Sequence, residues 1–468
     1  MFPAAFLAGS RLSSSKVAEP DTIVAISTPL GEGGVGLVRL SGPQALSIGR
    51  QLFHTHPELG ARIRRVEYGR IQVDGLDMDT ALAWVLKGPH SYTGEDTVEI
   101  SCHGSILLLE LLVQAALAKG AVAAGPGEFT RRAFLNGQLD LLQAEAVVDL
   151  IQADSKANLH TAYGHLQGRL SDRVNALKSR IIKALSLLEI GLDFSEEDTG
   201  IITRAQVADE LQQSLKETRL LIDTFEGSRR RQGGLLVALV GKPNVGKSTL
   251  LNALLGEERA IVTPIPGTTR DLVEGRTVWG GELIRLVDTA GIRSNVDTIE
   301  KEGIQRALAT AAEADFVLVI MDASQPWEDE QTPLFQALKG KAGLVVLNKT
   351  DLTRALEWPD GGFLDLSQIE ISASTGAGLA DLREQILALI PRNSAKEGVG
   401  LTRQRHMEAL KKSLDHIEVA LEMIQQNDLD ECIAAELQDV LWKMGEMLGE
   451  RVDEEVLDRI FADFCIGK

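Results

Sequence analysis

The 468-residue sequence predicts an α/β domain with a doubly wound parallel sheet, inserted in an all-α helical domain and preceded by a small α+β domain. Three observations lead to this fold class. Short apolar runs alternate with helical stretches over residues 230–393. Helical apolar stripes lie on both sides of that region, in residues 137–229 and 394–468. Residues 21–136 contain further strand runs and one apolar helical segment.

The start of the chain is expected to be a disordered tail over residues 1–20. This stretch has four serines and no acid before Glu19, which gives it a weak similarity to a targeting segment, although an extended or misassigned start is the preferred interpretation. Residues 21–136 follow as a small domain with a helix expected near 105–118. Its strand runs are TIVAIST, GVGLVRLSG and VEISCHG.

Two helical stretches have the spacing of one buried helix face. The first stripe, spaced 3, 4, 4 and 3, comprises Val174, Leu177, Ile181, Leu185 and Leu188. The second, spaced 4, 3, 4 and 3, comprises Leu410, Leu414, Ile417, Leu421 and Ile424. Core packing is favoured over any cofactor role. Because the ends of a compact domain usually lie close together, we expect the central domain to be inserted between the two helical parts.

The central domain contains five apolar strand runs, which are LLVALV, LIRLVD, DFVLVIMD, GLVVLNK and IEISAS. Each is followed by a loop and most by a helical stretch, the pattern of a doubly wound parallel sheet. The polar motifs discussed below follow these strands.

Composition excludes several classes of protein. Hydrophobic residues make up 44% and charged residues 25%, as in ordinary globular proteins. No apolar stretch has the roughly 20 residues of a membrane span. Three cysteines without a CxxC pair argue against a disulfide framework or zinc site and favour a reducing, cytoplasmic location. A net charge of −19 means that a nucleic acid would need a local basic patch.

The segment Gly241–Ser248 (GKPNVGKS) follows a strand run and precedes the helical TLLNALL, which is the setting of a phosphate-binding P-loop. Its glycines allow backbone N–H groups to surround phosphates at a helix N-terminus. We expect Lys247 to reach the β- and γ-phosphates and the Ser248 hydroxyl to ligate Mg²⁺.

Two further segments complete a phosphate site. Asp288–Gly291 (DTAG) follows the LIRLVD run, where a carboxylate can hold a metal-bound water and Gly291 can approach the γ-phosphate. Thr269, in Gly267–Asp271, is placed to give the second Mg²⁺ hydroxyl.

The base is predicted to be guanine. Asp351, in Asn348–Asp351 (NKTD), can accept hydrogen bonds from the N1–H and the exocyclic amine of guanine. Adenine would leave that carboxylate unpaired. The backbone of Ser372–Ala373 can meet guanine O6. Ile292 stands where many GTPases have a water-orienting glutamine, so another group must position the attacking water.

These motifs and both flanks closely resemble the MnmE (TrmE) family of tRNA-modification GTPases, over nearly everything from Asp21 to Lys468. The most specific stretches are Gly31–Gly42 (GEGGVGLVRLSG), Pro126–Ile151 (PGEFTRRAFLNGQLDLLQAEAVVDLI) and Phe464–Lys468 (FCIGK). Gly31-x-Gly-x-x-Gly36 also matches a dinucleotide fingerprint, but a strand pattern follows it instead of a helix, so a turn is favoured.

The resemblance implies a GTP hydrolase that is activated by K⁺ and dimerises through its nucleotide domains. It assigns K⁺ coordination to Asn244, Thr263, Ile265 and Thr268, and water positioning to Glu300, with Lys247 and Asn244 as further catalytic groups. A K⁺ near the β–γ bridge can do the work of an arginine finger. The residues expected to bind GTP and Mg²⁺ are Asn244, Val245, Gly246, Lys247, Ser248, Thr249, Thr263, Pro264, Ile265, Pro266, Gly267, Thr268, Thr269, Asp288, Thr289, Ala290, Gly291, Asn348, Lys349, Thr350, Asp351, Ser372, Ala373 and Ser374.

The resemblance also implies a folate site for 5,10-methylenetetrahydrofolate or 5-formyltetrahydrofolate in residues 21–136, which would also dimerise. The family contacts correspond to Arg39, Glu99 and Lys468, and to Gln138, where the family has lysine. It implies a homodimer working on tRNA with a flavoprotein of the MnmG (GidA) family in a heterotetramer or larger complex. FAD and NADH would be bound by that partner only. No membrane is involved.

The reaction so implied adds a carboxymethylaminomethyl or aminomethyl group at C5 of the tRNA wobble uridine. Two alternatives stay open. One is an Era-like regulatory GTPase in ribosome assembly without folate chemistry, and the other is a folate-dependent transferase with a GTPase scaffold. Cys465 has no base that the sequence can pair with it, so a structural role is the default.

Overall fold

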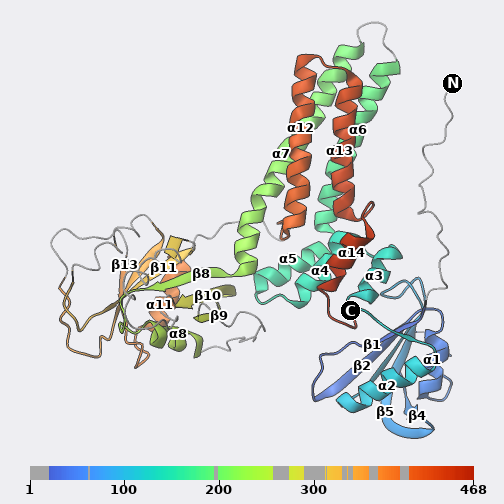
Figure 1. Ribbon diagram of the computed structural model, residues 1–468, viewed down its shortest axis with the longest axis horizontal. Helices are drawn as coiled ribbons and strands as arrows, with labels where there is room; N and C mark the ends of the chain where they lie inside the picture. Colours follow the sequence, from blue (N-terminus) through green and yellow to red (C-terminus); the bar gives the residue numbers. More distant parts are fainter. Residues whose placement is uncertain are drawn as a thin grey trace. The chain divides into compact units, whose positions relative to one another are not determined.

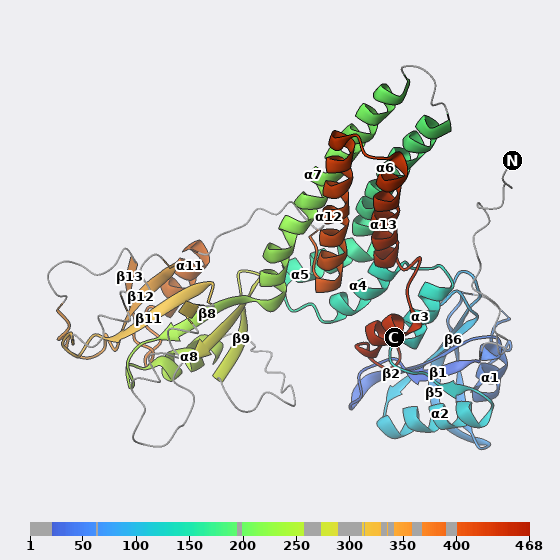
Figure 2. The same ribbon diagram turned by 45° about the horizontal axis from the view of Figure 1, so that its top comes forward.

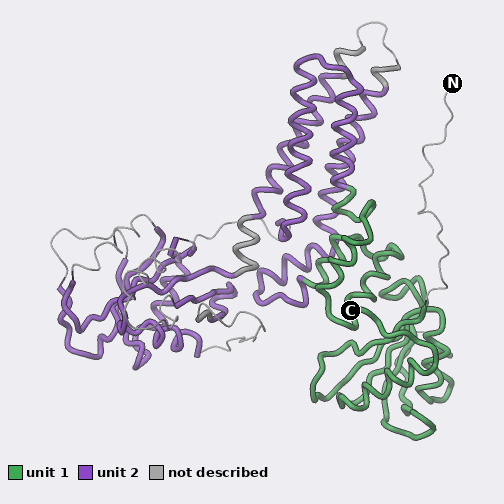
Figure 3. The backbone as a smooth tube through the Cα atoms, in the orientation of Figure 1, with its two compact units in different colours: residues 1–148, 445–468 green, residues 149–444 purple. Residues whose placement is uncertain are grey.

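The fold is that of a computed structural model (Figure 1). Side chains are described throughout the ranges below except in residues 190–193, 199–203, 226–233 and 273–274. The described residues are 21–61, 64–193, 199–256, 273–288, 311–312, 314–328, 335, 341–357, 367–389 and 400–468. The chain forms two compact units, one of residues 1–148 with 445–468 and one of residues 149–444 (Figure 3).

The first unit contains a mixed sheet with the order β3-β4-β5-β6-β2-β1-β7. Its strands are β1 (Ile23–Ile26), β2 (Gly33–Ser41), β3 (Phe53–His54), β4 (Glu67–Val73), β5 (Leu76–Leu86), β6 (Thr97–Gly104) and β7 (Val122–Ala123). All described pairs are antiparallel except β1 with β7. The strands predicted from the sequence correspond to β1, β2 and β6, whereas the β4–β5 hairpin was not identified.

Two helices, α1 (Ala45–Leu52) and α2 (Ile106–Ala118), bury apolar side chains against this sheet. The predicted helix near 105–118 is confirmed as α2, which Ser105 caps by accepting from Leu108 N. A methyl group on Gly36 of β2 would lie 2.7 Å from Leu109 Cδ1. The expectation that no helix follows these glycines is confirmed, but the favoured turn is wrong for Gly33–Gly36, which begin strand β2. Gly36 is needed there because the α2 side chain of Leu109 approaches it closely.

The last residues of the chain are part of the first unit. After α3 (Glu128–Leu135), α4 (Leu141–Ile151) and α14 (Glu454–Ala462), the C-terminal tail returns to the start of the domain. The Ser27 hydroxyl donates to Gly467 O at 3.0 Å, and Phe129 N donates to Lys468 O at 3.2 Å. The two ends of the sequence thus build one structure.

Long helices dominate one part of the second unit (Figure 2). They are α5 (Lys156–Leu166), α6 (Arg169–Asp193), α7 (Thr199–Gly233), α12 (Gln404–Gln426) and α13 (Asp430–Leu448), the last ending in the first unit. Val174, Leu177 and Ile181 of α6 are fully buried, as are Leu410 and Ile417 of α12. Core packing is therefore confirmed for the first stripe, in which only Leu185 is half-buried. It is confirmed in part for the second, in which Leu414, Leu421 and Ile424 are half-buried.

The second sheet has the order β13-β12-β11-β8-β10-β9. Its strands are β8 (Leu235–Val240), β9 (Val273–Trp279), β10 (Glu282–Asp288), β11 (Phe316–Asp322), β12 (Gly343–Asn348) and β13 (Ser367–Glu370). Five strands are parallel, whereas β9 pairs antiparallel with β10. Strand β9 was not predicted from the sequence, because VEGRTVW has a glycine and two charges in place of an apolar run.

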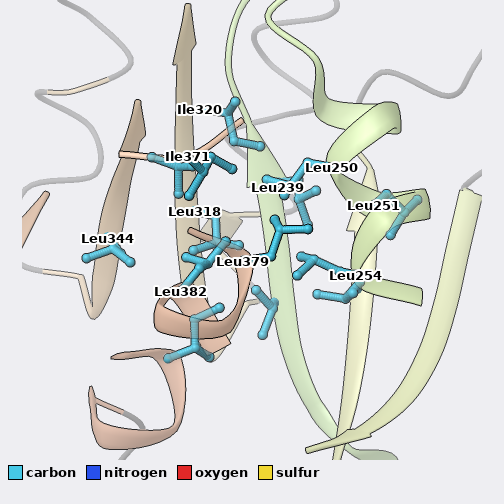
Figure 4. Close-up of a cluster of buried hydrophobic side chains, with 14 of the residues drawn as sticks. Leu239, Leu250, Leu251, Leu254, Leu318, Ile320, Leu344, Ile371, Leu379 and Leu382 are labelled. Atoms are coloured by element: carbon cyan, nitrogen blue, oxygen red, sulfur yellow. The ribbon is translucent and has the colours of Figure 1, made fainter. Parts of the chain in front are cut away.

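Helices α8 (Lys247–Gly256) and α11 (Leu379–Leu389) pack on one face of this sheet. Leu250, Leu251 and Leu254 of α8 meet the strand residues Leu239 and Leu318 in one buried cluster (Figure 4). This packing fixes the start of α8, and with it the loop that joins β8 to α8. Among the helices described, none has the length and apolar character to cross a membrane.

Candidate functional site

The loop between β8 and α8 takes a conformation that its sequence makes possible. Gly246 has φ 98°, and a side chain there would collide with Asn348 Nδ2. Gly241 has φ 154°, and a side chain there would collide with Ile320 O. Asn244 is left-handed at φ 65° although it is not a glycine. The two glycines let the backbone wrap closely around a small volume at the α8 N-terminus, as phosphate binding requires.

Lys247 lies across this loop. It is only 5% exposed, and its ammonium donates to Gly241 O at 2.9 Å and to Lys242 O at 2.7 Å. Burial lowers its pKa from the ordinary value, which nearby Asp288 partly opposes. A phosphate that enters the loop can take over the ammonium from the two carbonyl groups, so this position is compatible with the predicted phosphate contact, which stays a prediction.

Ser248 and Asp288 form the metal end of the site. The Ser248 hydroxyl donates to Asp288 Oδ2 at 2.6 Å, and Asp288 is only 1% exposed at the end of β10. A hydroxyl and a buried carboxylate side by side are hard oxygen donors and fit Mg²⁺, held directly by Ser248 and through a water by Asp288. Several predicted site residues lie outside the described residues. They are Thr263, Pro264, Ile265, Pro266, Gly267, Thr268, Thr269, Thr289, Ala290, Gly291 and Glu300.

The segment after β12 connects to the P-loop. Asn348, 2% exposed, donates through Nδ2 to Val245 O at 2.9 Å. Its Oδ1 accepts from Ala373 N at 2.9 Å. The Ser372 hydroxyl donates to Asp351 Oδ1 at 2.7 Å. Three segments that are distant in sequence are therefore joined in one place, with the Asp351 carboxylate exposed to receive a base.

One charged residue near this site, Asp322, was not identified from the sequence. The Lys349 ammonium donates to Asn244 O at 2.9 Å and to Asp322 Oδ2 at 2.6 Å. Asp322 is the last residue of β11, directly beside Asn348 in the β11–β12 register. Its position at the carboxyl end of a central strand is the signal that could have identified it.

A second polar site lies in the first unit. Arg39 of β2 and Glu99 of β6 are register partners, and Arg39 Nε lies 2.6 Å from Glu99 Oε1. Arg39 Nη1 also donates to Gly467 O at 3.5 Å. Burial, followed by the charge of Arg39, lowers the pKa of Lys468, while Glu99 raises it. Three of the four residues predicted to bind folate are thus brought together.

Gln138, the fourth predicted residue, is exposed, and no described contact joins it to the other three. Its backbone N–H donates to Ala133 O at 2.8 Å. Two aromatic rings that were not predicted from the sequence lie beside Arg39. Arg39 Cζ lies 5.8 Å from the centroid of Tyr92 and 5.5 Å from that of Phe129. Charged groups of both signs beside aromatic rings fit a flat, polar ligand with an acidic tail.

Comparisons with known proteins place the chain in a family. A family model described as MnmE helical domain matches residues 141–465, and one described as GTP-binding protein TrmE N-terminus matches residues 22–138. A relative named tRNA modification GTPase MnmE from Geobacter sulfurreducens is 42% identical over 453 residues, 96% of this chain and 99% of that protein. One of the same name from Geotalea uraniireducens is 41% identical over 454 residues, with the same coverage. A crystal structure of Era in complex with MgGDPNP and a ribosomal RNA segment is 31% identical over 39% of this chain and 66% of that chain, with a TM-score of 0.27.

Proposed function

Because the chain belongs to the MnmE family of tRNA modification GTPases, we propose that its GTP hydrolysis serves the modification of C5 of a tRNA wobble uridine. That it hydrolyses GTP follows from the family. The observation that supports the further step is the second site, in which Arg39, Glu99 and Lys468 come together from both ends of the chain. A GTPase that acted only as a switch would have no need of it.

The ligand of this second site is proposed to be a tetrahydrofolate that carries a one-carbon unit. The Glu99 carboxylate can accept from the N–H edge of the pterin, and the Arg39 and Lys468 cations can hold the acidic tail. The rings of Tyr92 and Phe129 lie close to the Arg39 guanidinium. When bound, the folate would supply the carbon that becomes attached to the uridine.

The roles of the nucleotide site are proposed on the same basis. Lys247 would hold the β- and γ-phosphates, while Ser248 and Asp288 would hold Mg²⁺. Asn244 of the P-loop, with Thr263, Ile265 and Thr268, would coordinate K⁺, which would supply positive charge beside the β–γ bridge. Glu300 would orient the attacking water in the absence of a glutamine after the DTAG segment.

The remaining components would come from other molecules. A flavoprotein of the MnmG type, with FAD and NADH, would carry the redox chemistry in a complex with a dimer of this chain. GTP hydrolysis would drive a conformational change in that complex. Folate, flavin and amine donor would together build the aminomethyl or carboxymethylaminomethyl group on the tRNA.

Reconstitution tests this proposal. The purified chain would be mixed with such a flavoprotein, unmodified tRNA, GTP, K⁺, methylenetetrahydrofolate, and glycine or ammonium, and the nucleosides would be analysed by mass spectrometry. We expect a modified uridine with wild type, none with Lys247→Ala or Glu99→Gln, and wild-type yield with Asp77→Asn, which changes only exposed contacts with Arg70 and Gln72. Unmodified uridine with wild type, despite measured folate binding and GTP turnover, would contradict it.

A further inference from the structure

The Lys349 ammonium joins two other segments of the nucleotide site. It donates to the Asn244 carbonyl of the P-loop at 2.9 Å and to Oδ2 of Asp322, at the end of β11, at 2.6 Å. Lys349 itself follows β12. The contact therefore ties together three loops that leave adjacent strands β8, β11 and β12 of the sheet.

Two of these residues have an unusual backbone conformation. Asn244 has φ 65° and Lys349 has φ 64°, although neither is a glycine. Left-handed backbone costs a residue with a side chain about 1–2 kcal/mol. Such residues persist where their surroundings determine them, and they gather at functional sites. A hydrogen bond from one left-handed residue to the other is part of what holds both.

Asp322 is built to hold the ammonium in place. Its side chain is 10% exposed, and Oδ1 accepts from both the N–H and the hydroxyl of Ser324, at 2.9 and 2.6 Å. The other oxygen, Oδ2, therefore faces Lys349. Burial raises the pKa of this carboxyl, but the hydrogen bonds from Lys349 and Ser324 outweigh burial and hold the pKa below its usual range. The carboxylate is therefore charged at neutral pH.

The neighbouring residue makes a parallel contact. Asn348 Nδ2 donates to Val245 O, the next carbonyl of the P-loop after that of Asn244. Two consecutive side chains of Asn348–Asp351, the segment expected to bind guanine, thus hold two consecutive carbonyl groups of the P-loop. The separation between these segments decides whether one nucleotide can bind through its base and its phosphates at the same time. In enzymes, misplacing a bound group by about 1 Å can lower the reaction rate by about two orders of magnitude.

We propose that Asp322 is a positioning residue for guanine-nucleotide binding, acting through Lys349 to hold the P-loop carbonyl of Asn244. In this proposal Asp322 acts on the nucleotide only through Lys349. The competing explanation is an ion pair that only stabilises the domain. The two explanations differ in a measurable way, because a positioning residue changes nucleotide dissociation only while Lys349 is present.

The test is a double-mutant cycle in the full-length chain, read by the dissociation rate of fluorescent GDP. Asp322→Asn keeps the size of the side chain but removes the charge, and we expect dissociation to become at least about tenfold faster. Lys349→Met should have a similar effect. The double variant should dissociate no faster than the more affected single variant, because both remove one interaction.

A matched control is Glu328→Gln. Glu328 also pairs with a P-loop lysine, Lys242, but through an exposed contact that should leave the dissociation rate unchanged. Ser324→Ala, which removes one bond to Asp322 Oδ1, provides a milder variant, and we expect about threefold faster dissociation. If Asp322→Asn lowers only the melting temperature, or if the two single effects add, the proposal is overturned.

The same variants separate this inference from the proposed K⁺ activation. GDP dissociation is measured without hydrolysis, so it tests Asp322 whether or not K⁺ stimulates turnover. If K⁺ does stimulate wild type, Asp322→Asn should also raise the K⁺ concentration for half-maximal turnover, since Asn244 is then less well held. Unchanged dissociation would remove the role of Asp322 even if K⁺ stimulation were confirmed.

Discussion

Arg39 and Glu99 face each other across strands β2 and β6, with 2.6 Å between Arg39 Nε and Glu99 Oε1. Both side chains are largely buried, so the pair is ordered before any ligand arrives. A ligand that donates to the Glu99 carboxylate therefore meets a group that Arg39 already orients. Removing the charge of either residue would leave the other charge buried without its partner.

We therefore predict that Glu99→Gln weakens binding of 5-formyltetrahydrofolate by more than about tenfold, because a charge-assisted hydrogen bond to the pterin is lost. Isothermal titration calorimetry measures this affinity. Asp77→Asn, at an exposed ion pair on β5, is the control and should bind as wild type does. Equal affinity of Glu99→Gln and wild type would place the folate elsewhere.

The base specificity predicted for Asp351 can be reversed by one substitution. Asp351→Asn exchanges an acceptor for a donor and should weaken GTP binding by roughly a hundredfold, while xanthine nucleotides, which have a carbonyl at position 2, should gain affinity. Competition against fluorescent GDP by GTP and XTP measures the change. A uniform loss for both nucleotides would show general damage to the loop held by Ser372.

The tail near Gly467 is predicted to be important for stability. Gly467 has φ 93°, and a side chain there would collide with Ile26 O. Gly75 has φ 78° with open space around it, so Gly75→Ala shows the cost of backbone strain alone, about 1 kcal/mol. Gly467→Ala should lower the free energy of unfolding by clearly more. Thermal unfolding of both variants measures the two losses of unfolding free energy. Equal losses would contradict the contact between the tail at Gly467 and Ile26.

Acid should destabilise the helical part of the chain through His165. Burial first, and then the charge of His406, lowers the pKa of this imidazole to about 4, against about 6.5 in an unfolded chain. The unfolded chain therefore takes up the proton first. Stability should fall as pH decreases from about 6.5 towards 4, by up to about 3 kcal/mol, and should be fully retained above pH 6.5.

Urea unfolding at several pH values measures this dependence. His165 lies among His406, Asp149 and Arg403, and Asp149 partly offsets the two positive groups. His165→Gln should flatten the slope between pH 6.5 and 5. A slope that stays the same in His165→Gln would assign the acid sensitivity to other residues.

The nucleotide motifs were predictable because each is a short run whose chemistry depends on residue type and on the strand before it. Lys247, Ser248 and Asp288 lie where that logic places them. Asp322 was not predictable in this way, because its role depends on a β11–β12 register that no local pattern encodes. Strand β9 was not predicted for a different reason. It lies at the edge of the sheet, where a strand needs fewer apolar residues than a buried one.

The second site shows the same division. The resemblance to a family identified Arg39, Glu99 and Lys468, which are 429 positions apart at the extremes (468 − 39) and meet only because the tail returns to β1. Tyr92 and Phe129 had no signal in the sequence, because their positions beside Arg39 follow from tertiary packing. The predicted domain limits and the Gln138 contact stay predictions.

The central claim, a GTPase activated by K⁺ through Asn244, is tested most directly by GTP turnover in K⁺ and in Na⁺ at equal ionic strength. Wild type and Asn244→Ala would be compared, with phosphate release as the readout. We predict fast turnover by wild type in K⁺ only, and slow turnover by Asn244→Ala in both salts. Equal rates for wild type in K⁺ and Na⁺ would contradict cation activation.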